Sequence, residues 1–163
     1  FRDRIDLEVI LVDDGSSDKT YDGLQQRLAH HAWAKVHRHA CNRGISAAIL
    51  TGVHVAQHEW IASMDADCTY DPIQLMDMIQ AVREDTALVT ASPYHPQGRV
   101  EGVPRWRLQL SKGASYAYGL LIGGSLHTYT SCFRLFRKSF LSDLRLNDEG
   151  FVGVTEMLWH VSR

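Results

Sequence analysis

The chain has 163 residues, of which 45% are hydrophobic and 22% are charged, and its formal net charge is −2. This length and composition predict one folded domain with a real core and exclude an intrinsically disordered chain. The near-neutral charge excludes the global basic field of many nucleic-acid-binding proteins, so we expect no nucleic acid partner.

The cysteine content and the hydropathy bear on the compartment. Cys41, Cys68 and Cys132 form no Cys-x-x-Cys pair, which indicates free thiols in a reducing compartment. We interpret Cys68 and Cys132 as small apolar fillers. The apolar stretches 45–53 and 117–126 are too short and interrupted to span a bilayer, so we expect a cytoplasmic protein. The chain opens on Phe1, not on Met, and we expect it to be truncated at both ends.

Apolar runs and segments of helical spacing alternate along the first 92 residues. Strands are predicted at residues 8–12, 34–39, 60–64 and 88–91. Helices are predicted at residues 18–30, 45–58 and 71–84, the last with proline at its first helical position. This alternation of strand and helix predicts a parallel sheet with helices on both faces.

The pattern changes after Ser92. Turn residues predict a loop at 93–98, helical spacing follows at 105–122, a further strand is predicted at 131–137, and another helix begins at residue 155. We therefore divide the chain into two halves, residues 1–92 and residues 93–163.

An acidic pair, Asp65 and Asp67, comes directly after the third predicted strand. Side chains two residues apart in extended backbone point to one face, and two carboxylates on one face repel unless a cation lies between them. Oxygen ligands suit Mg²⁺ or Mn²⁺, and such a metal can bridge two phosphates. The alternative is that the two acids cap the next helix or lie in a plain loop. Their position after a buried strand favours the metal.

A second acidic pair, Asp13 and Asp14, follows the first predicted strand and precedes Gly15. Glycine permits a positive φ, so the chain can reverse tightly and leave a carboxylate facing the crevice. A carboxylate there can accept a hydrogen bond from a base N–H or a ribose hydroxyl. The alternative is a simple turn with a helix cap. Of the nine histidines, His37 and His39 could share a strand face, and His54 and His58 share a helix face. No acidic or cysteine partner completes either pair, and we interpret both pairs as surface or packing residues.

The order and spacing of several motifs together resemble the family-2 glycosyltransferases. In the first half the matching stretches are 12–20, 42–44 with Ala48 and Gly52, 64–67, and 71–72. In the second half, stretches similar to the dolichyl-phosphate mannosyltransferase branch are 91–94, Gly98, 100–102, Arg107, 111–115 and 130–134. The resemblance covers nearly the whole chain.

The resemblance implies a Rossmann-like GT-A fold, a three-layer α/β/α arrangement with a mostly parallel sheet. It implies an inverting glycosyltransferase that moves a sugar from a nucleoside-diphosphate sugar to a polyprenyl (dolichyl-like) phosphate. Residues 1–92 would bind the nucleotide-sugar, and residues 93–163 would form a truncated acceptor half. A membrane-borne acceptor would place the protein peripherally at the cytoplasmic face of a membrane.

The resemblance also implies roles for single residues. Asp65 and Asp67 would hold Mg²⁺ or Mn²⁺ on the donor diphosphate, and Asp13, Asp14 and Asp65 would contact the donor. The catalytic set would be Asp67 and Arg134, with the arginine supporting the sugar or phosphate site. The acceptor phosphate would face Arg107, Ser111 and Lys112, and Glu156 falls near an acidic position of the family.

Three features depart from the family pattern. The family's opening strand, with its nucleotide loop, is expected to be missing from this chain. Cys132 stands where the family usually has glycine, and Pro93 stands where close relatives have arginine.

One alternative function is a receiver domain of the response-regulator type, which also has an acidic pair after a strand. Another is a non-catalytic relic that binds nucleotide-sugars, which the missing strand favours for this chain.

Overall fold

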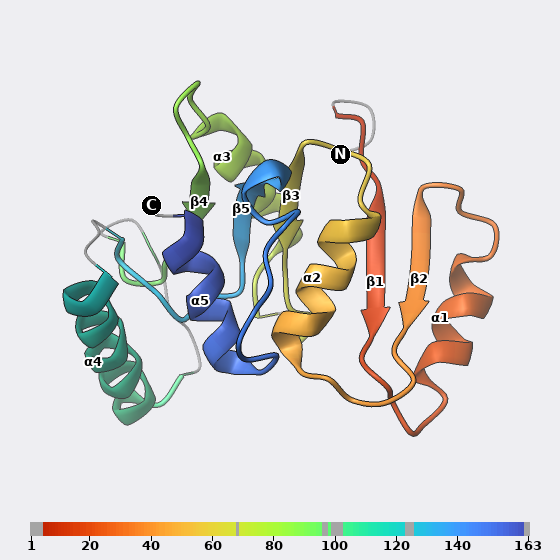
Figure 1. Cartoon of the computed structure of the whole chain (residues 1–163), viewed down its shortest axis with the longest axis horizontal. Helices are drawn as coiled ribbons and strands as arrows, with labels where there is room; N and C mark the ends of the chain where they lie inside the picture. The colour runs from red at the N-terminus through yellow and green to blue at the C-terminus, as the bar shows by residue number, and fades with distance from the viewer. Residues whose placement is uncertain (1–4, 68, 96–97, 99–102, 123–125, 162–163) are drawn as a thin grey trace.

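The computed structural model describes residues 5–67, 69–95, 98, 103–122 and 126–161, and within them the chain forms five strands and five α-helices (Figure 1). The strands are β1 (Val9–Asp13), β2 (Ala34–Arg38), β3 (Trp60–Ser63), β4 (Leu88–Thr90) and β5 (Arg134–Arg137). The α-helices are α1 (Thr20–Leu28), α2 (Ile45–Val55), α3 (Leu75–Gln80), α4 (Arg105–Ile122) and α5 (Phe151–Val161). Short 3-10 helices occupy Pro72–Gln74 and Lys138–Phe140.

The strands form two hydrogen-bonded groups. β1 pairs with β2 in parallel, and β5 lies between β3 and β4, antiparallel to both. The predicted mostly parallel α/β fold is confirmed, with β5 as the antiparallel strand. Because β5 comes from the second half of the chain, the halves 1–92 and 93–163 share one sheet.

Alternate residues of β5 and the segment before it face opposite sides of the sheet, as the two-residue repeat of a strand requires. Phe136 packs in a cluster with Val53 of α2 and Met157 of α5. Phe133 and Leu135 belong to a second cluster, with Met78 of α3. The sheet therefore lies between α2 and α5 on one face and α3 on the other, which is the expected three-layer arrangement.

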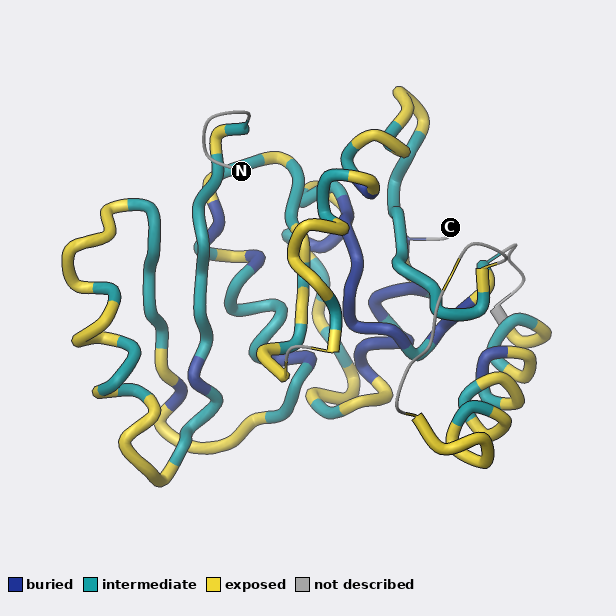
Figure 2. Tube along the Cα trace, turned by 180° about the vertical axis from the view of Figure 1, so that it is seen from behind, coloured by how far each residue is buried: buried dark blue, intermediate teal, exposed yellow. Residues whose placement is uncertain are grey.

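Helix α2 joins the two strand groups. It packs against β1 and against α5, and its Ile49, Leu50 and Val53 reach the cluster around Phe136. Within the described residues no backbone ladder connects β1 to β3, although these strands flank α2 in both views (Figures 1 and 2). The expected missing strand stays a prediction.

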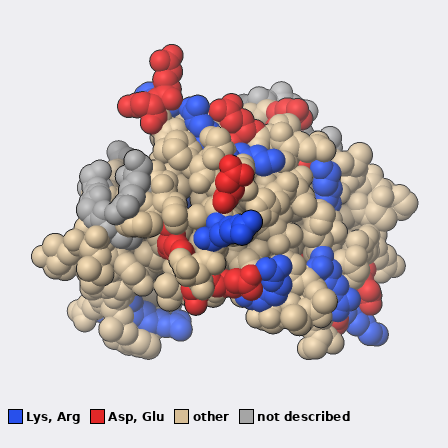
Figure 3. All heavy atoms as spheres, viewed as in Figure 1, with Lys and Arg blue, Asp and Glu red and all other residues tan. Residues whose placement is uncertain are grey.

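The side covered by α2 and α5 carries charges of both signs in a mixed pattern (Figure 3). Lys, Arg, Asp and Glu alternate across it, without a broad region of a single sign. In the part of the chain that the structure describes, none of the helices has the length and apolarity needed to cross a bilayer.

Most predicted elements form within a few residues of their expected positions, with two exceptions. The helix predicted at 71–84 is a 3-10 turn followed by a shorter α3 that ends at Gln80. The helix predicted from residue 155 begins at Phe151. Its first turn contains Gly153, whose hydrogen in place of a side chain allows close packing on Ser46 and the Asp148 carbonyl, a tertiary contact that helical spacing does not reveal.

Gly44 provides a test of the contact between α2 and the segment before α5. Its φ is +102°, and a Cβ there would collide with the Glu149 carbonyl oxygen. We expect Gly44→Ala to lower the free energy of unfolding by about 2 kcal/mol or more, since both the backbone and the neighbour must shift. Gly23→Ala in α1, where a Cβ meets nothing within 4 Å, is the control and should be neutral or stabilising. Equal urea midpoints for Gly44→Ala and the wild type would contradict the contact.

Candidate functional site

The predicted acidic residues follow the ends of β1 and β3, two strands that end on the same side of the molecule (Figure 1). Asp13 closes β1, Asp14 follows it, and Asp65 comes two residues after β3. Gly15 has a φ of +74°, and a Cβ there would collide with the backbone of Cys41, so the predicted tight turn is present. This edge is where open α/β sheets bind ligands.

The Asp13 side chain is almost wholly buried, with 1% of its surface exposed. Its Oδ1 accepts a hydrogen bond from the Ser16 N–H at 3.2 Å. Its Oδ2 lies 3.3 Å from Arg38 Nε, within ion-pair distance but without hydrogen-bond geometry. One oxygen of this buried carboxylate thus lacks a hydrogen-bond donor from the described residues, and the Arg38 guanidinium lies beside it.

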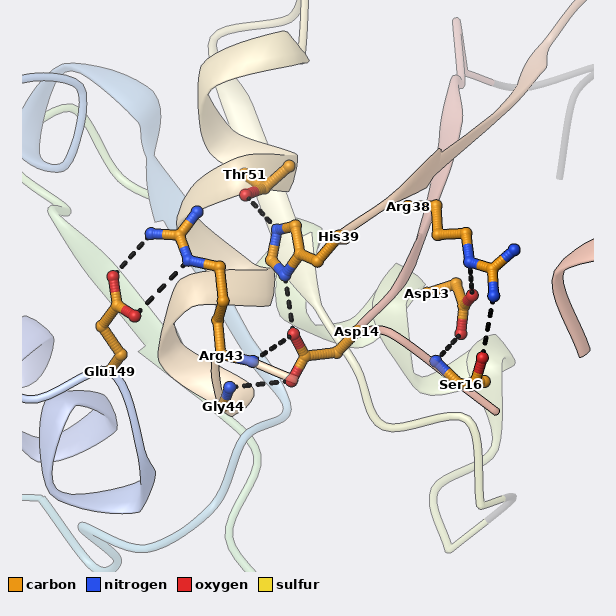
Figure 4. Close-up of polar contacts among 9 residues, drawn as sticks. All are labelled: Asp13, Asp14, Ser16, Arg38, His39, Arg43, Gly44, Thr51 and Glu149. Atoms are coloured by element: carbon orange, nitrogen blue, oxygen red, sulfur yellow. Dashed lines mark hydrogen bonds and ion pairs between the residues drawn. The ribbon is translucent and has the colours of Figure 1, made fainter. Parts of the chain in front are cut away.

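The two oxygens of Asp14 are occupied by the protein itself (Figure 4). Oδ1 accepts from the Arg43 N–H at 2.9 Å and contacts His39 Nδ1 at 2.6 Å, while Oδ2 accepts from the Gly44 N–H at 2.8 Å. The other ring nitrogen of His39 lies 2.8 Å from the Thr51 hydroxyl. Burial opposes ionisation of Asp14, but the hydrogen bonds from Arg43, His39 and Gly44 hold the pKa of its carboxyl below the ordinary value.

The first turn of α2 is closed by protein contacts. The N–H groups of Ser46 and Ala47 donate to the Glu149 carbonyl, and the Ser46 hydroxyl donates to the Gly150 carbonyl. The Glu149 side chain forms an ion pair with Arg43 at 2.5 Å. Because these donors are satisfied, this helix start does not offer its N–H groups to a phosphate.

Asp65 and Asp67 influence each other electrostatically. Burial, together with the charge of Asp67, raises the pKa of the Asp65 carboxyl, against a hydrogen bond from the Cys132 thiol. Asp67 is exposed, and the N–H of Thr69 donates to it at 2.9 Å and lowers the pKa of its carboxyl. None of the ion pairs among the described residues involves either aspartate.

These features fit a divalent cation that takes its remaining ligands from a substrate. Among the described residues, no group of three or more His, Cys, Asp or Glu side chains is arranged to hold a metal alone. Magnesium sites commonly use only one or two carboxylates and complete the coordination with phosphates and water. The donor set of Asp65 and Asp67 is of that kind.

A pocket of about 190 Å³ lies beside Asp65. The residues that line it come from three parts of the chain and are Asp65, Tyr70, Pro93, Ser111, Thr128, Thr130, Ser131 and Cys132. Ser111 lies on α4, and its hydroxyl is 3.2 Å from the Thr130 hydroxyl. The fold therefore places a predicted acceptor residue in the same pocket as a predicted metal ligand.

The other two predicted acceptor residues lie on the exposed side of α4. The Arg107 guanidinium stacks on the neighbouring Trp106 ring at 5.7 Å, and the Lys112 ammonium lies 5.3 Å from the centre of the Tyr94 ring. Both side chains are solvent-exposed, so each can turn toward an anion at the surface.

Arg134 and Glu156 are not among the residues that line this pocket. The Arg134 guanidinium is buried and donates to the carbonyls of Val154 and Tyr129 at 2.6 and 2.8 Å. Burial lowers the pKa of this guanidinium to about 10, which leaves it charged at neutral pH. Glu156 on α5 accepts hydrogen bonds from the backbone and side-chain amides of Asn147.

Two buried residues that we interpreted as packing residues also lie at this site. His39 connects Asp14 to Thr51, and Cys132 lines the same pocket as Asp65. Burial and the nearby Asp65 charge raise the pKa of the Cys132 thiol to about 11, so it stays protonated. Neither role has a local signal, because the partners are 25 and 67 positions away in the sequence.

The Asp14 contacts predict a pH-dependent contribution to stability. A carboxyl whose pKa is lowered on folding stabilises the fold at pH values above its pKa in the unfolded chain, which is near 3.8. This stabilisation is lost as the pH falls through the lower pKa of the folded state. We expect Asp14→Asn to cost about 1–3 kcal/mol at pH 7 and progressively less at acid pH. Urea unfolding at several pH values measures this, with exposed Asp85→Asn as the control. A penalty for Asp14→Asn that does not change with pH would contradict the charged role.

The chain shows similarity to known proteins along most of its length. The model of the family described as Glycosyl transferase family 2 matches residues 2–145. A dolichol-phosphate mannosyltransferase of Pyrococcus furiosus is 28% identical over 156 residues, which cover 94% of this chain and 44% of that protein. A polyprenol monophosphomannose synthase of Mycolicibacterium smegmatis is 30% identical over 161 residues, which cover 94% of this chain and 60% of that protein.

A dodecaprenyl-phosphate galacturonate synthase of Rhizobium johnstonii is 30% identical over 146 residues, which cover 87% of this chain and 41% of that protein. The chain thus spans between 41% and 60% of the length of these curated relatives. The family match decides against the receiver-domain alternative, and because it extends over well more than half of the residues, the chain belongs to glycosyl transferase family 2.

Proposed function

We propose that the whole protein transfers a sugar from a nucleoside-diphosphate donor to a polyprenyl phosphate with inversion at the anomeric carbon. The observation that carries this proposal is the pocket in which Asp65, at the end of β3, meets Ser111 of α4. Three relatives whose names specify transfer to, or synthesis of, polyprenyl-linked sugars support the acceptor class. The family supports sugar transfer over the binding-only alternative.

The donor diphosphate would lie against Asp65 and Asp67 through Mg²⁺ or Mn²⁺. The cation would offset the negative charge that develops on the departing diphosphate. Asp65 is partly buried next to the pocket, whereas Asp67 is exposed, so the pair presents its charge toward solvent where a phosphate can approach. The catalytic role of Asp67 stays a prediction.

The nucleoside would contact the end of β1. Of the two predicted residues, Asp13 has a carboxylate oxygen without a hydrogen-bond donor among the described residues, and that oxygen is buried beside Arg38. Asp14 has both oxygens occupied by Arg43, Gly44 and His39. We propose that it acts on the donor indirectly, by holding the turn that presents Asp13.

The acceptor would approach along α4. A phosphate is already a nucleophile at neutral pH, so one of its oxygens can attack the anomeric carbon without a strong base. Arg107 and Lys112 supply positive charge on the exposed side of the helix, and a guanidinium can bind a phosphate through two parallel hydrogen bonds. Arg134 and Glu156 would contribute through the segments that they hold.

The exposed side of α4 also suits a membrane surface. Helix α4 is exposed over much of its length (Figure 2). Its large apolar residues Trp106, Leu110, Tyr116, Leu120 and Leu121 are from 61% to 81% accessible. Trp106, Leu110 and Leu120 lie on one side at helical spacing. Apolar residues next to Arg105 and Arg107 are typical of helices that lie in the interface of anionic membranes. We propose peripheral binding at the cytoplasmic face.

The metal proposal predicts a specific loss of donor binding. We expect Asp67→Asn to remove the metal-dependent part of donor affinity, by about 10-fold or more, while the melting temperature stays unchanged because the side chain is exposed. Calorimetry of the whole protein with nucleoside-diphosphate sugars, with Mg²⁺ or with EDTA, measures this. Exposed Asp77→Asn in α3 is the matched control. Full metal-dependent affinity in the Asp67 variant would exclude this site.

The acceptor proposal predicts separate roles for two parts of α4 in vesicle binding. We expect Leu120→Ser with Leu121→Ser to weaken binding to anionic vesicles generally, since it removes exposed apolar surface. Arg107→Ala should instead reduce the additional binding that polyprenyl phosphate produces, by about 10-fold. Sedimentation with and without polyprenyl phosphate separates the two effects, and Arg27→Ala in α1 serves as the control. An identical profile for Arg107→Ala and wild type would remove this residue from the acceptor site.

A further inference from the structure

The buried ring of His39 has no role of its own in the proposed transfer. Only 7% of its side chain is exposed. Nδ1 is 2.6 Å from Asp14 Oδ1, and Nε2 is 2.8 Å from the Thr51 hydroxyl on α2 (Figure 4). The backbone N–H of the same residue donates to the Asp13 carbonyl at 2.9 Å. His39 therefore contacts both aspartates of the turn that follows β1.

The ionised state of Asp14 fixes where the proton of its contact with His39 lies. Although burial opposes ionisation, the hydrogen bonds that Asp14 accepts hold the pKa of its carboxyl below the ordinary value. At neutral pH this carboxylate can therefore only accept, so the contact requires a hydrogen on Nδ1. Nε2 faces a hydroxyl, which can either donate or accept. The two contacts thus hold the ring in one orientation whether the imidazole is neutral or charged.

Asp14 transmits this orientation to the segment before α2. Its Oδ1 is shared between His39 Nδ1 and the Arg43 N–H, and its Oδ2 accepts from the Gly44 N–H. Three donors from different directions restrict the carboxylate to one rotamer. Without the His39 donor, Oδ1 would keep a single protein partner, and the carboxylate, which is 19% exposed, could turn toward solvent.

The turn 13–16 lies directly on the segment that these contacts hold. Gly15 packs so closely on the Cys41 backbone that a Cβ would collide with it. A displacement of Asp14 against residues 39–44 therefore displaces the turn as well. A loosened turn would have to be ordered again when a ligand binds, and that ordering lowers the affinity.

We propose that His39 is a positioning residue for donor binding. It acts through Asp14, whose rotamer it sets, and so preorganises the turn 13–16 toward the nucleoside of the donor. This inference rests on the proposed function, in which the nucleoside contacts the end of β1. The competing role is packing alone. A ring that only stabilises the fold would change the free energy of unfolding and leave the nucleotide affinity of the folded protein unaltered.

Two amide substitutions separate these roles, because they differ in reach. His39→Asn puts an amide N–H at the place of Nδ1, toward Asp14, whereas His39→Gln puts its amide at the place of Nε2, toward Thr51. The measurement is calorimetry of the whole protein in Mg²⁺ with UDP, GDP, CDP and ADP, at a temperature where circular dichroism shows each variant folded. We expect His39→Gln to weaken nucleotide binding about tenfold and His39→Asn to stay within about threefold of wild type.

A second readout reports the geometry of Asp14 without any nucleotide. The amide resonances of Arg43 and Gly44, whose N–H groups donate to Asp14, should shift in His39→Gln and stay close to wild type in His39→Asn. The matched control is His54→Gln on α2, which removes a ring contact of 3.1 Å with the Ser142 carbonyl and does not involve the turn. It should keep both the affinity and these resonances.

The hydroxyl partner of the ring keeps the test independent of a folding failure at His39. Thr51→Val removes the hydroxyl and keeps the shape of the side chain, so the ring loses one of its two anchors. We expect about threefold weaker nucleotide binding in Thr51→Val and wild-type binding in Thr51→Ser. If neither His39 variant folds, this pair decides, and equal affinities in Thr51→Val and Thr51→Ser would overturn the positioning role.

The outcomes separate this inference from the proposed function. Wild-type affinity in folded His39→Gln would reduce His39 to a packing residue and leave the proposed donor class standing. Equal losses in His39→Asn and His39→Gln would overturn the action through Asp14. If the wild type binds no nucleoside diphosphate and no nucleoside-diphosphate sugar, the proposed function fails, and the positioning role with it.

Discussion

The rest of this structure depends on the hydrogen bonds that the Asp14 carboxylate accepts. It accepts from the backbone N–H groups of Arg43 and Gly44 and contacts the His39 ring, so it ties the end of β1 to the end of β2 and to the start of α2. Helix α2 in turn packs on β1, on α5 and on the cluster around Phe136. A single half-buried carboxylate thus connects the first strand group to the helix that packs on the second, and its charge is stabilised by hydrogen bonds from the protein.

The insertion of β5 between β3 and β4 creates the pocket. The Ser63 hydroxyl at the end of β3 donates to the Cys132 carbonyl at 2.7 Å, which brings the segment before β5 beside Asp65. Tyr129 in this segment contacts α4, because the Ser115 hydroxyl accepts from its N–H and Gly119 leaves room for its ring. Residues predicted for the donor and for the acceptor therefore meet because an antiparallel strand returns to the middle of the sheet. Arg134 supports the same arrangement from within the core.

Local patterns predicted the elements well, and long-range contacts explain the errors. The strands and α2 appear where apolar runs and helical spacing indicate, and the positive φ of Gly15 follows from its place after Asp13 and Asp14. The early start of α5 depends on the fit of Gly153 against Ser46, 107 positions away. The interpretation of His39 and Cys132 as packing residues missed their contacts with Asp14 and Asp65, since no spacing rule connects residues that meet only in the folded chain.

The sequence by itself determined the family, the three-layer class and the presence of carboxylates at the ends of two strands. These are local properties, because an apolar run that stops at an acid marks a strand end wherever the strand lies in the sheet. Only the tertiary structure decided the strand order, the antiparallel direction of β5 and the different states of Asp13 and Asp14. It alone also assembled the hydroxyl-lined pocket, whose walls span residues 65 to 132, because contacts between distant residues arise from packing and not from any spacing along the chain.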